Sequence, residues 1–139
     1  MVDLQTIHVI LDMQKLLQEV IVLTKEAGEF IRQESRKFDS KNIEYKGMND
    51  LVSYVDKEAE ARLVKGLNEL LPGSGFIAEE GTSTRKSDIY NWIIDPLDGT
   101  TNFIHGLPIF AISIALMKRG ELVMGLVYEI NRDECFHAI

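Results

Sequence analysis

WIIDPLDGTTNF, at residues 92–103, joins an apolar segment to two aspartates and a Gly-Thr-Thr turn. The apolar, β-branched residues 90–94 are typical of a buried strand, which places Asp95 at the end of that strand. Pro96 fixes its own φ angle, and Asp98 followed by glycine is a turn signature. The pattern therefore predicts a sharp bend between the two aspartates.

This bend can bring the carboxylates of Asp95 and Asp98 and the carbonyl oxygen of Leu97 to one point. Such an all-oxygen ligand set suits a hard cation such as Mg²⁺ and suits zinc poorly. Gly99 lets the backbone approach a ligand closely, and Thr100 can begin a helix whose N-terminal N–H groups bind phosphate. The run predicts a place where metal ions and a phosphate meet, although Asp-Pro-x-Asp-Gly alone is also an ordinary type I turn.

Two helices are predicted in the first half of the chain. Apolar side chains at intervals near 3.6 residues indicate a long amphipathic helix over residues 12–36. A polar break at residues 39–42 precedes a short strand predicted at residues 43–45. Ser53 and Asp56 can then cap a second amphipathic helix that continues to a Pro-Gly pair.

The second half of the chain is dominated by strand patterns, at residues 76–79, 90–95, 110–118 and 122–130. Arg119 and Gly120 predict a hairpin turn between the last two strands, and the polar residues 81–88 predict a surface loop. Helices followed by adjacent strands indicate the α+β class, with two long helices packed on an antiparallel sheet.

Composition limits the possible partners and location. The 139 residues are 45% hydrophobic and 27% charged, which is typical of a soluble globular domain. The net charge of -7 argues against a nucleic-acid partner. Cys135 is the only cysteine and excludes an internal disulfide, so we expect a reducing, cytoplasmic location. The longest apolar stretch, residues 110–117, is too short to span a bilayer, and we expect no membrane partner.

The run at residues 92–103 and the IHGLP segment after it resemble the signature of the inositol monophosphatase family, within the metal-dependent, lithium-sensitive phosphatase superfamily. Two other segments fall in the order that this family requires, GFIAEEG at residues 75–81 and KGMNDLVSYVD at residues 46–56. The resemblance implies the N-terminal half of a layered αβαβα sugar-phosphatase fold. It also implies a Mg²⁺-dependent phosphoric monoester hydrolase that acts through a metal-activated water.

The resemblance further implies a set of metal ligands for two or three Mg²⁺ ions. Asp95 would bridge two ions, Glu79 and the Leu97 carbonyl would complete the coordination of one, and Asp98 would bind the other. Without the downstream motif, Glu79 and Glu80 could equally be the solvated end of a strand.

Catalytic roles follow from the same resemblance. Glu79 and the Thr100 hydroxyl would orient the attacking water, and Asp56 would accept a hydrogen bond from Thr100. Asp56 could also simply begin the second helix, where acids are favoured by the helix dipole. The residues expected to contact the substrate are Leu97, Asp98, Gly99 and Thr100.

One family feature is missing from this sequence. Family members are much longer, and their second half supplies a further metal-binding aspartate in a Trp-Asp-x-Ala-Ala-Gly motif, whereas the only tryptophan here is Trp92. We therefore expect residues 1–139 to be a single domain, the N-terminal portion of such a phosphatase with its C-terminal half absent. Activity of this chain alone is expected to be weak or absent.

The expected substrate is inositol monophosphate or a similar small phosphorylated polyol or sugar. Two alternatives stay open: fructose-1,6-bisphosphatase-type activity, and a truncated, non-catalytic metal-binding or dimerising module. Apolar surface left uncovered by a missing half would favour self-association, so a homo-oligomer such as a homodimer is expected.

Overall fold

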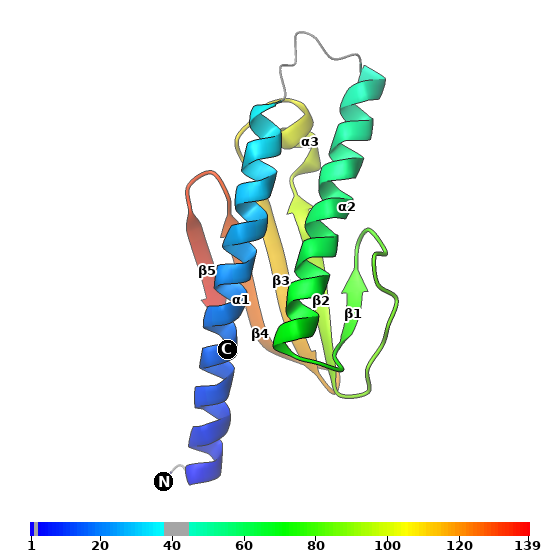
Figure 1. Ribbon diagram of the computed structural model, residues 1–139. Helices are drawn as coiled ribbons and strands as arrows, with labels where there is room; N and C mark the ends of the chain where they lie inside the picture. Colours follow the sequence, from blue (N-terminus) through cyan, green and yellow to red (C-terminus); the bar gives the residue numbers. More distant parts are fainter. Residues whose placement is uncertain (2, 38–44) are drawn as a thin grey trace.

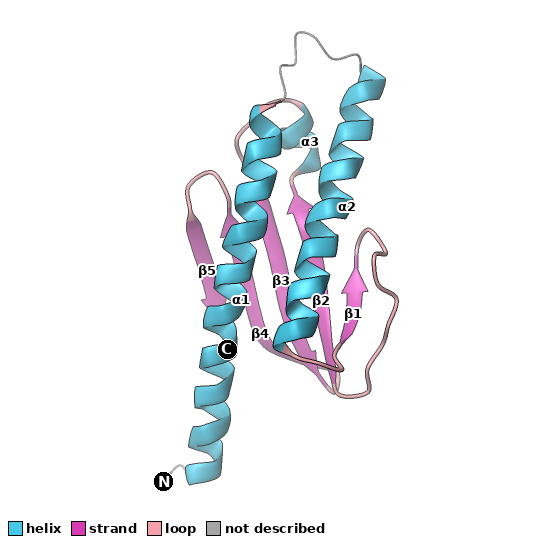
Figure 2. Ribbon diagram, viewed as in Figure 1, coloured by secondary structure: helices cyan, strands magenta, loops and turns pink. Residues whose placement is uncertain are grey.

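The computed structural model describes residues 1, 3–37 and 45–139. Two long helices lie side by side along one face of a five-stranded sheet (Figure 1), and Figure 2 shows the same arrangement by element type. The elements in chain order are α1 (Leu4–Arg36), α2 (Tyr45–Leu70), β1 (Gly75–Ala78), β2 (Tyr90–Asp98), α3 (Thr100–Ile104), β3 (Ala111–Lys118), β4 (Glu121–Glu129) and β5 (Glu134–Ala138). The α+β class is as expected from the sequence.

The first helix is longer than predicted at its N-terminus. It begins at Leu4, where the Asp3 side chain caps it by accepting a hydrogen bond from the Thr6 N–H at 2.8 Å. It ends at Arg36, as the periodicity predicted. Apolar residues also occur before residue 12, but Leu4, Ile7, Val9 and Ile10 are exposed, so this part of the helix lies outside the core that the periodicity indicated.

The second helix begins at Tyr45, so the predicted helix start at Ser53 was wrong, as was the extension of a strand through Tyr45. Leu51 and Val52 pack against the core, which continues the helix on the N-terminal side of Ser53. The polar break predicted at residues 39–42 and the first two residues of the predicted strand lie outside the described residues.

The sheet has the strand order β1-β2-β3-β4-β5. The β2-β3 and β3-β4 pairings are antiparallel, as predicted, but β1 pairs with β2 in parallel, so the sheet is mixed. The fifth strand, which the sequence analysis did not predict, pairs antiparallel with β4. Loop residues 79–89 carry the chain back along the sheet between these two strands, and they include the predicted surface loop. Arg119 and Gly120 have φ angles of 50° and 89°, which confirms the predicted tight hairpin turn.

The two faces of the sheet differ in their surroundings. Trp92, Leu116 and Met124 are register partners on the face toward the helices, and all three are buried. On the opposite face, Val127 and its register partner Phe136 are 43% and 61% exposed. One apolar face of the sheet therefore forms the core with α1 and α2, while the other is open.

A search of the described residues found no helix that combines the length and the hydropathy needed to cross a membrane.

Candidate functional site

Two acidic side chains meet where β1 and β2 end. Because the strands are parallel and Ala78 is aligned with Ile94, the next residues, Glu79 and Asp95, lie side by side. The Glu79 N–H donates a hydrogen bond to the Ile94 carbonyl oxygen at 3.3 Å, which fixes this alignment. Since carboxyl ends of parallel strands share one edge of a sheet, pairing brings together residues 16 positions apart.

The pKa of Asp95 is raised from 3.8 to about 6. Burial is the largest cause, followed by a hydrogen bond and the charge of Glu79, and then by the charge of Asp98. The Leu97 N–H acts in the opposite direction, since it donates to Asp95 Oδ1 at 3.3 Å. The two carboxylates are thus close enough to share a proton, and a cation bound between them would relieve the same crowding.

The chain bends after Asp95, as the sequence predicted, although β2 continues to Asp98. Asp95 pairs with Ser113 and Asp98 pairs with Ala111, so one extra residue is accommodated in β2 as a β-bulge. Leu97, inside the bulge, is 2% exposed, whereas Asp98 is exposed. The bulge therefore turns Asp98 toward solvent at the same end of the sheet as Asp95.

Gly99 connects the bulge to the start of α3. Its φ angle of 100° belongs to the left-handed region, and a Cβ atom there would lie 3.0 Å from the Ile109 carbonyl oxygen. The Phe103 N–H makes a helical hydrogen bond to the Gly99 carbonyl at 3.0 Å. The N–H groups of residues 100–102 therefore precede the first helical hydrogen bond and have no carbonyl one turn back. Such a helix start can hold an anion.

Asp56 reaches the same region from α2. It is 6% exposed, and its pKa is raised to about 7, mainly by burial and then by the charges of Glu80, Glu79 and Asp95. We call Asp56, Glu79, Asp95 and Asp98 the acidic cluster. Although α3 packs against α2, the described residues show no hydrogen bond between the Thr100 hydroxyl and Asp56.

Glu60, one helical turn after Asp56, is a residue that the sequence reasoning missed. Its side chain is fully buried and accepts hydrogen bonds from the N–H groups of Glu80 and Thr82 at 2.7 and 2.8 Å. The available signal was a glutamate next to Ala59, on the apolar face of the helix. A buried carboxylate at such a position must have hydrogen-bond partners.

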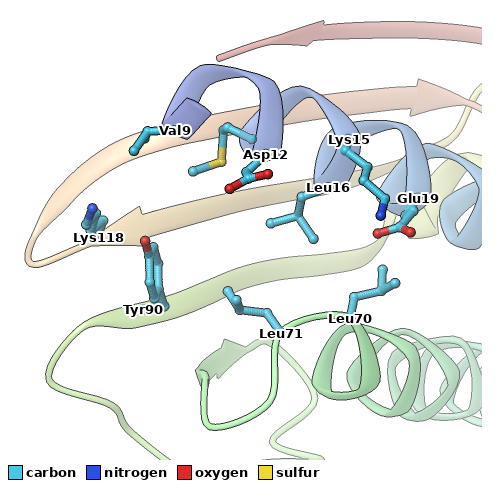
Figure 3. A pocket seen from close by; sticks show the side chains of 10 residues that line it. Val9, Asp12, Lys15, Leu16, Glu19, Leu70, Leu71, Tyr90 and Lys118 are labelled. Atoms are coloured by element: carbon cyan, nitrogen blue, oxygen red, sulfur yellow. The ribbon is translucent and has the colours of Figure 1, made fainter. Parts of the chain in front are cut away.

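Two hollows flank the sheet at opposite ends. A hollow of about 280 Å³ lies on the open face and is lined by both Glu79 and Asp95. A groove of about 340 Å³ lies beside α1, with Leu16, Tyr90 and Lys118 among its lining residues (Figure 3). Because Tyr90 begins β2, about 17 Å of strand separates this groove from Asp95. The groove is therefore remote from the acidic cluster.

The donor atoms of the acidic cluster are carboxylate oxygens, which fit Mg²⁺. Within residues 1, 3–37 and 45–139, no three Asp, Glu, His or Cys side chains converge closely enough to hold a metal ion by themselves. A Mg²⁺ site needs only one or two carboxylates, because the ion keeps several of its waters. The contacting pair Glu79 and Asp95, with the nearby Asp98, satisfies that requirement.

Comparison with known proteins identifies the family. Residues 12–139 match the inositol monophosphatase family, and the chain belongs to it. The chain is 42% identical over 132 residues to "Inositol monophosphatase 2" of Solanum lycopersicum, covering 91% of this chain and 49% of that protein. It is 38% identical over 117 residues to "Fructose-1,6-bisphosphatase/inositol-1-monophosphatase" of Aquifex aeolicus, covering 84% of this chain and 44% of that protein.

Solved structures agree with this assignment. Inositol monophosphatase II of Staphylococcus aureus superposes with a TM-score of 0.73 at 32% sequence identity, covering 91% of this chain and 45% of that one. The fold described above is therefore shared with this family. The chain spans about half the length of the curated relatives that it matches.

Proposed function

We propose that this chain carries metal-binding and phosphate-binding residues of a Mg²⁺-dependent phosphomonoesterase. The observation that supports the proposal is the contact between Glu79 and Asp95 at the end of two parallel strands, next to the Gly99 turn and the start of α3. Bound Mg²⁺ would supply a nucleophilic water and neutralise the charge of the phosphate and of the leaving alkoxide. The Glu79, Asp95 and Asp98 carboxylates and the Leu97 carbonyl would be the ligands.

The remaining roles are assigned to residues around this pair. The Glu79 side chain is exposed, so it can accept a proton from a water molecule at the proposed metal site. Thr100, at the first position of α3, would orient the same water through its hydroxyl, with Asp56 as its acceptor. The N–H groups of Gly99 and Thr100 would hold the phosphate oxygens, together with substrate contacts from Leu97 and Asp98.

Inositol monophosphate or a similar small phosphorylated polyol is the substrate that the family membership favours. Fructose-1,6-bisphosphatase-type activity is a second candidate, because the Aquifex aeolicus relative carries both activities in its name. A non-catalytic metal-binding or dimerising module is a third. It is favoured by the lack of a third converging carboxylate among the described residues and by the open apolar sheet face.

Self-association through the open face would account for a homo-oligomer. The exposed apolar side chains there, including Ile77, Val127 and Phe136, are of a kind that proteins normally cover. The cytoplasmic location, and the absence of nucleic-acid and membrane partners, stay predictions.

The test is phosphate release from inositol-1-phosphate and from fructose-1,6-bisphosphate in the presence of Mg²⁺. The chain is compared with Asp95→Asn, with a chelator-treated sample, and with Asp88→Asn as a control, because Asp88 is an exposed carboxylate in the loop before β2. Binding of Mn²⁺, followed by its electron paramagnetic resonance signal, is measured on the same variants.

Turnover that is lost in Asp95→Asn and with chelator, but kept in Asp88→Asn, would support the enzyme and identify its substrate class. Mn²⁺ binding that depends on Asp95 without any turnover would support the metal-binding module. Equal Mn²⁺ binding by the chain and by Asp95→Asn would refute the proposed site.

A further inference from the structure

Glu60 is a buried carboxylate, and its hydrogen-bond partners among the described residues are backbone N–H groups. Its side chain has no exposed surface, and none of the ion pairs formed by the described residues includes it. Oε2 accepts from the Glu80 N–H at 2.7 Å, and Oε1 accepts from the Thr82 N–H at 2.8 Å. Burying a carboxylate without a cation is costly, so these two short, charge-assisted hydrogen bonds must offset that cost.

The Glu80 N–H belongs to the turn that follows β1, and the Thr82 N–H comes directly after that turn. The Gly81 N–H closes this turn on the Ala78 carbonyl at 3.3 Å, and Gly81 has a left-handed φ angle of 70°. Glu79 therefore occupies the second position of the turn. Its own N–H is bonded to Ile94, and the next N–H, that of Glu80, is bonded to Glu60.

The backbone of Glu79 is thus fixed from two directions. The sheet holds it on one side through Ile94, and α2 holds it on the other side through Glu60. Without the second anchor, residues 79–82 would be held by the end of a four-residue edge strand and, further along the loop, by the contacts of Arg85 with Ser74, Phe76 and Asn68. The Glu79 side chain would then lose its fixed position relative to Asp95.

We propose that Glu60 is a positioning residue, which holds the turn after β1 so that Glu79 lies within reach of the ion bound by Asp95. This inference rests on the proposed metal site. The role requires a carboxylate, because both of its oxygens accept from N–H groups. Glutamine would keep one acceptor and turn an NH₂ group toward the other N–H, leaving that buried donor unpaired.

The test uses the whole 139-residue chain, labelled with ¹⁵N, and two readouts. The first is hydrogen exchange of the Glu80 and Thr82 amides, and the second is Mn²⁺ affinity from electron paramagnetic resonance. The variants are Glu60→Gln and Glu60→Asp, with Glu69→Gln as a control because Glu69 is exposed on the same helix. Asp95→Asn is included as the variant that lacks the metal ligand itself.

In Glu60→Gln we expect the two amides to exchange at least about tenfold faster and the Mn²⁺ affinity to fall about 10-fold to 100-fold, the range found for residues that orient metal ligands. The Glu69→Gln control should match the original chain. Glu60→Asp keeps two acceptor oxygens and should retain more affinity than Glu60→Gln, which a purely structural loss would not reproduce. If Glu60→Gln fails to fold, as judged by circular dichroism, Glu60→Asp carries the test, with faster amide exchange and weaker binding than in the control.

Normal Mn²⁺ affinity in Glu60→Gln, together with loss of binding in Asp95→Asn, would overturn the positioning role and leave the proposed function standing. Binding that is unchanged in both variants would overturn the metal site and the role of Glu60 with it. Unchanged exchange of the Glu80 and Thr82 amides in Glu60→Gln would show that Glu60 does not hold the turn.

Discussion

Replacing Asp56 by asparagine should stabilise the metal-free chain at pH 8. Folding raises the pKa of this carboxyl from 3.8 to about 7, first by burial and then by the charges of Glu80, Glu79 and Asp95. Between these pH values the folded chain therefore binds more protons than the unfolded chain. The contribution of Asp56 to the stability of the folded chain is therefore greatest below about pH 4, and it is lost as the pH rises through 7. Asparagine cannot ionise, so its contribution does not change with pH.

The magnitude follows from the size of the pKa change. A rise of about 3 pH units corresponds to about 4 kcal/mol, at about 1.4 kcal/mol for each unit. Because this end of the sheet is open to water at Glu79 and Asp98, solvent screening reduces the effect, and we expect about 2 kcal/mol. For 139 residues, at about 2.1 cal/mol/K each, this corresponds to a Tm about 7 °C higher.

The assay is thermal unfolding followed by circular dichroism at pH 4 and pH 8, with chelator present to exclude metal ions. Asp56→Asn should match the original chain at pH 4 and exceed its Tm at pH 8. The matched control is Asp50→Asn, because Asp50 is exposed on the same helix. The pKa of Asp95 is also raised, to about 6, so Asp56→Asn should still lose some stability as the pH rises, although less than the original chain. An Asp56→Asn variant that is no more stable than the original chain at pH 8 would refute this electrostatic account.

Three further substitutions test the fold and its open face. Gly99→Ala should lower the free energy of unfolding by about 1 to 3 kcal/mol, because its φ of 100° is strained for alanine, and urea unfolding measures the loss. Gly75→Ala should cost about 1 to 3 kcal/mol in the same assay, since its Cβ would lie 2.5 Å from the Ser87 backbone nitrogen. Phe136→Glu should weaken concentration-dependent self-association in sedimentation velocity, because Phe136 is 61% exposed on the open sheet face.

Matched controls exist for the two glycine substitutions. Gly125→Ala places a Cβ in open space within β4, and it should be tolerated if the clash at Gly75 is the cause. Gly120 also has a positive φ, but a Cβ atom there would meet no other atom. Gly120→Ala therefore measures backbone strain alone, whereas Gly99→Ala adds the contact with the Ile109 carbonyl oxygen. A chain that sediments as a compact monomer at all concentrations would contradict the expected self-association.

Local patterns were sufficient to predict most of the secondary structure. The periodicity of α1, the hairpin at Arg119 and the bend after Asp95 depend on neighbouring residues, and all three are present in the structure. The start of α2 was predicted wrongly because Ser53 is a good N-cap residue, whereas tertiary packing of the preceding turn extends the helix. Capping preferences are worth about 1 kcal/mol, and burial of apolar side chains can exceed that.

The direction of β1 was not predictable in the same way. A strand of four residues carries no signal that distinguishes parallel from antiparallel pairing, and the sequence led us to expect a wholly antiparallel sheet. This direction matters for the candidate site, because only parallel pairing with this register puts Glu79 beside Asp95.

The amino-acid sequence was enough to determine the chemistry available in this protein: an apolar strand ending in two aspartates, a glycine that permits a positive φ, and a helix start with free N–H groups. Only the tertiary structure decided that Glu79 lies beside Asp95 and that the buried Glu60 of α2 is hydrogen-bonded to the turn after β1. The physical reason is the range of the interactions. Turn and cap preferences act over a few residues, whereas strand pairing and burial join segments that are far apart along the chain.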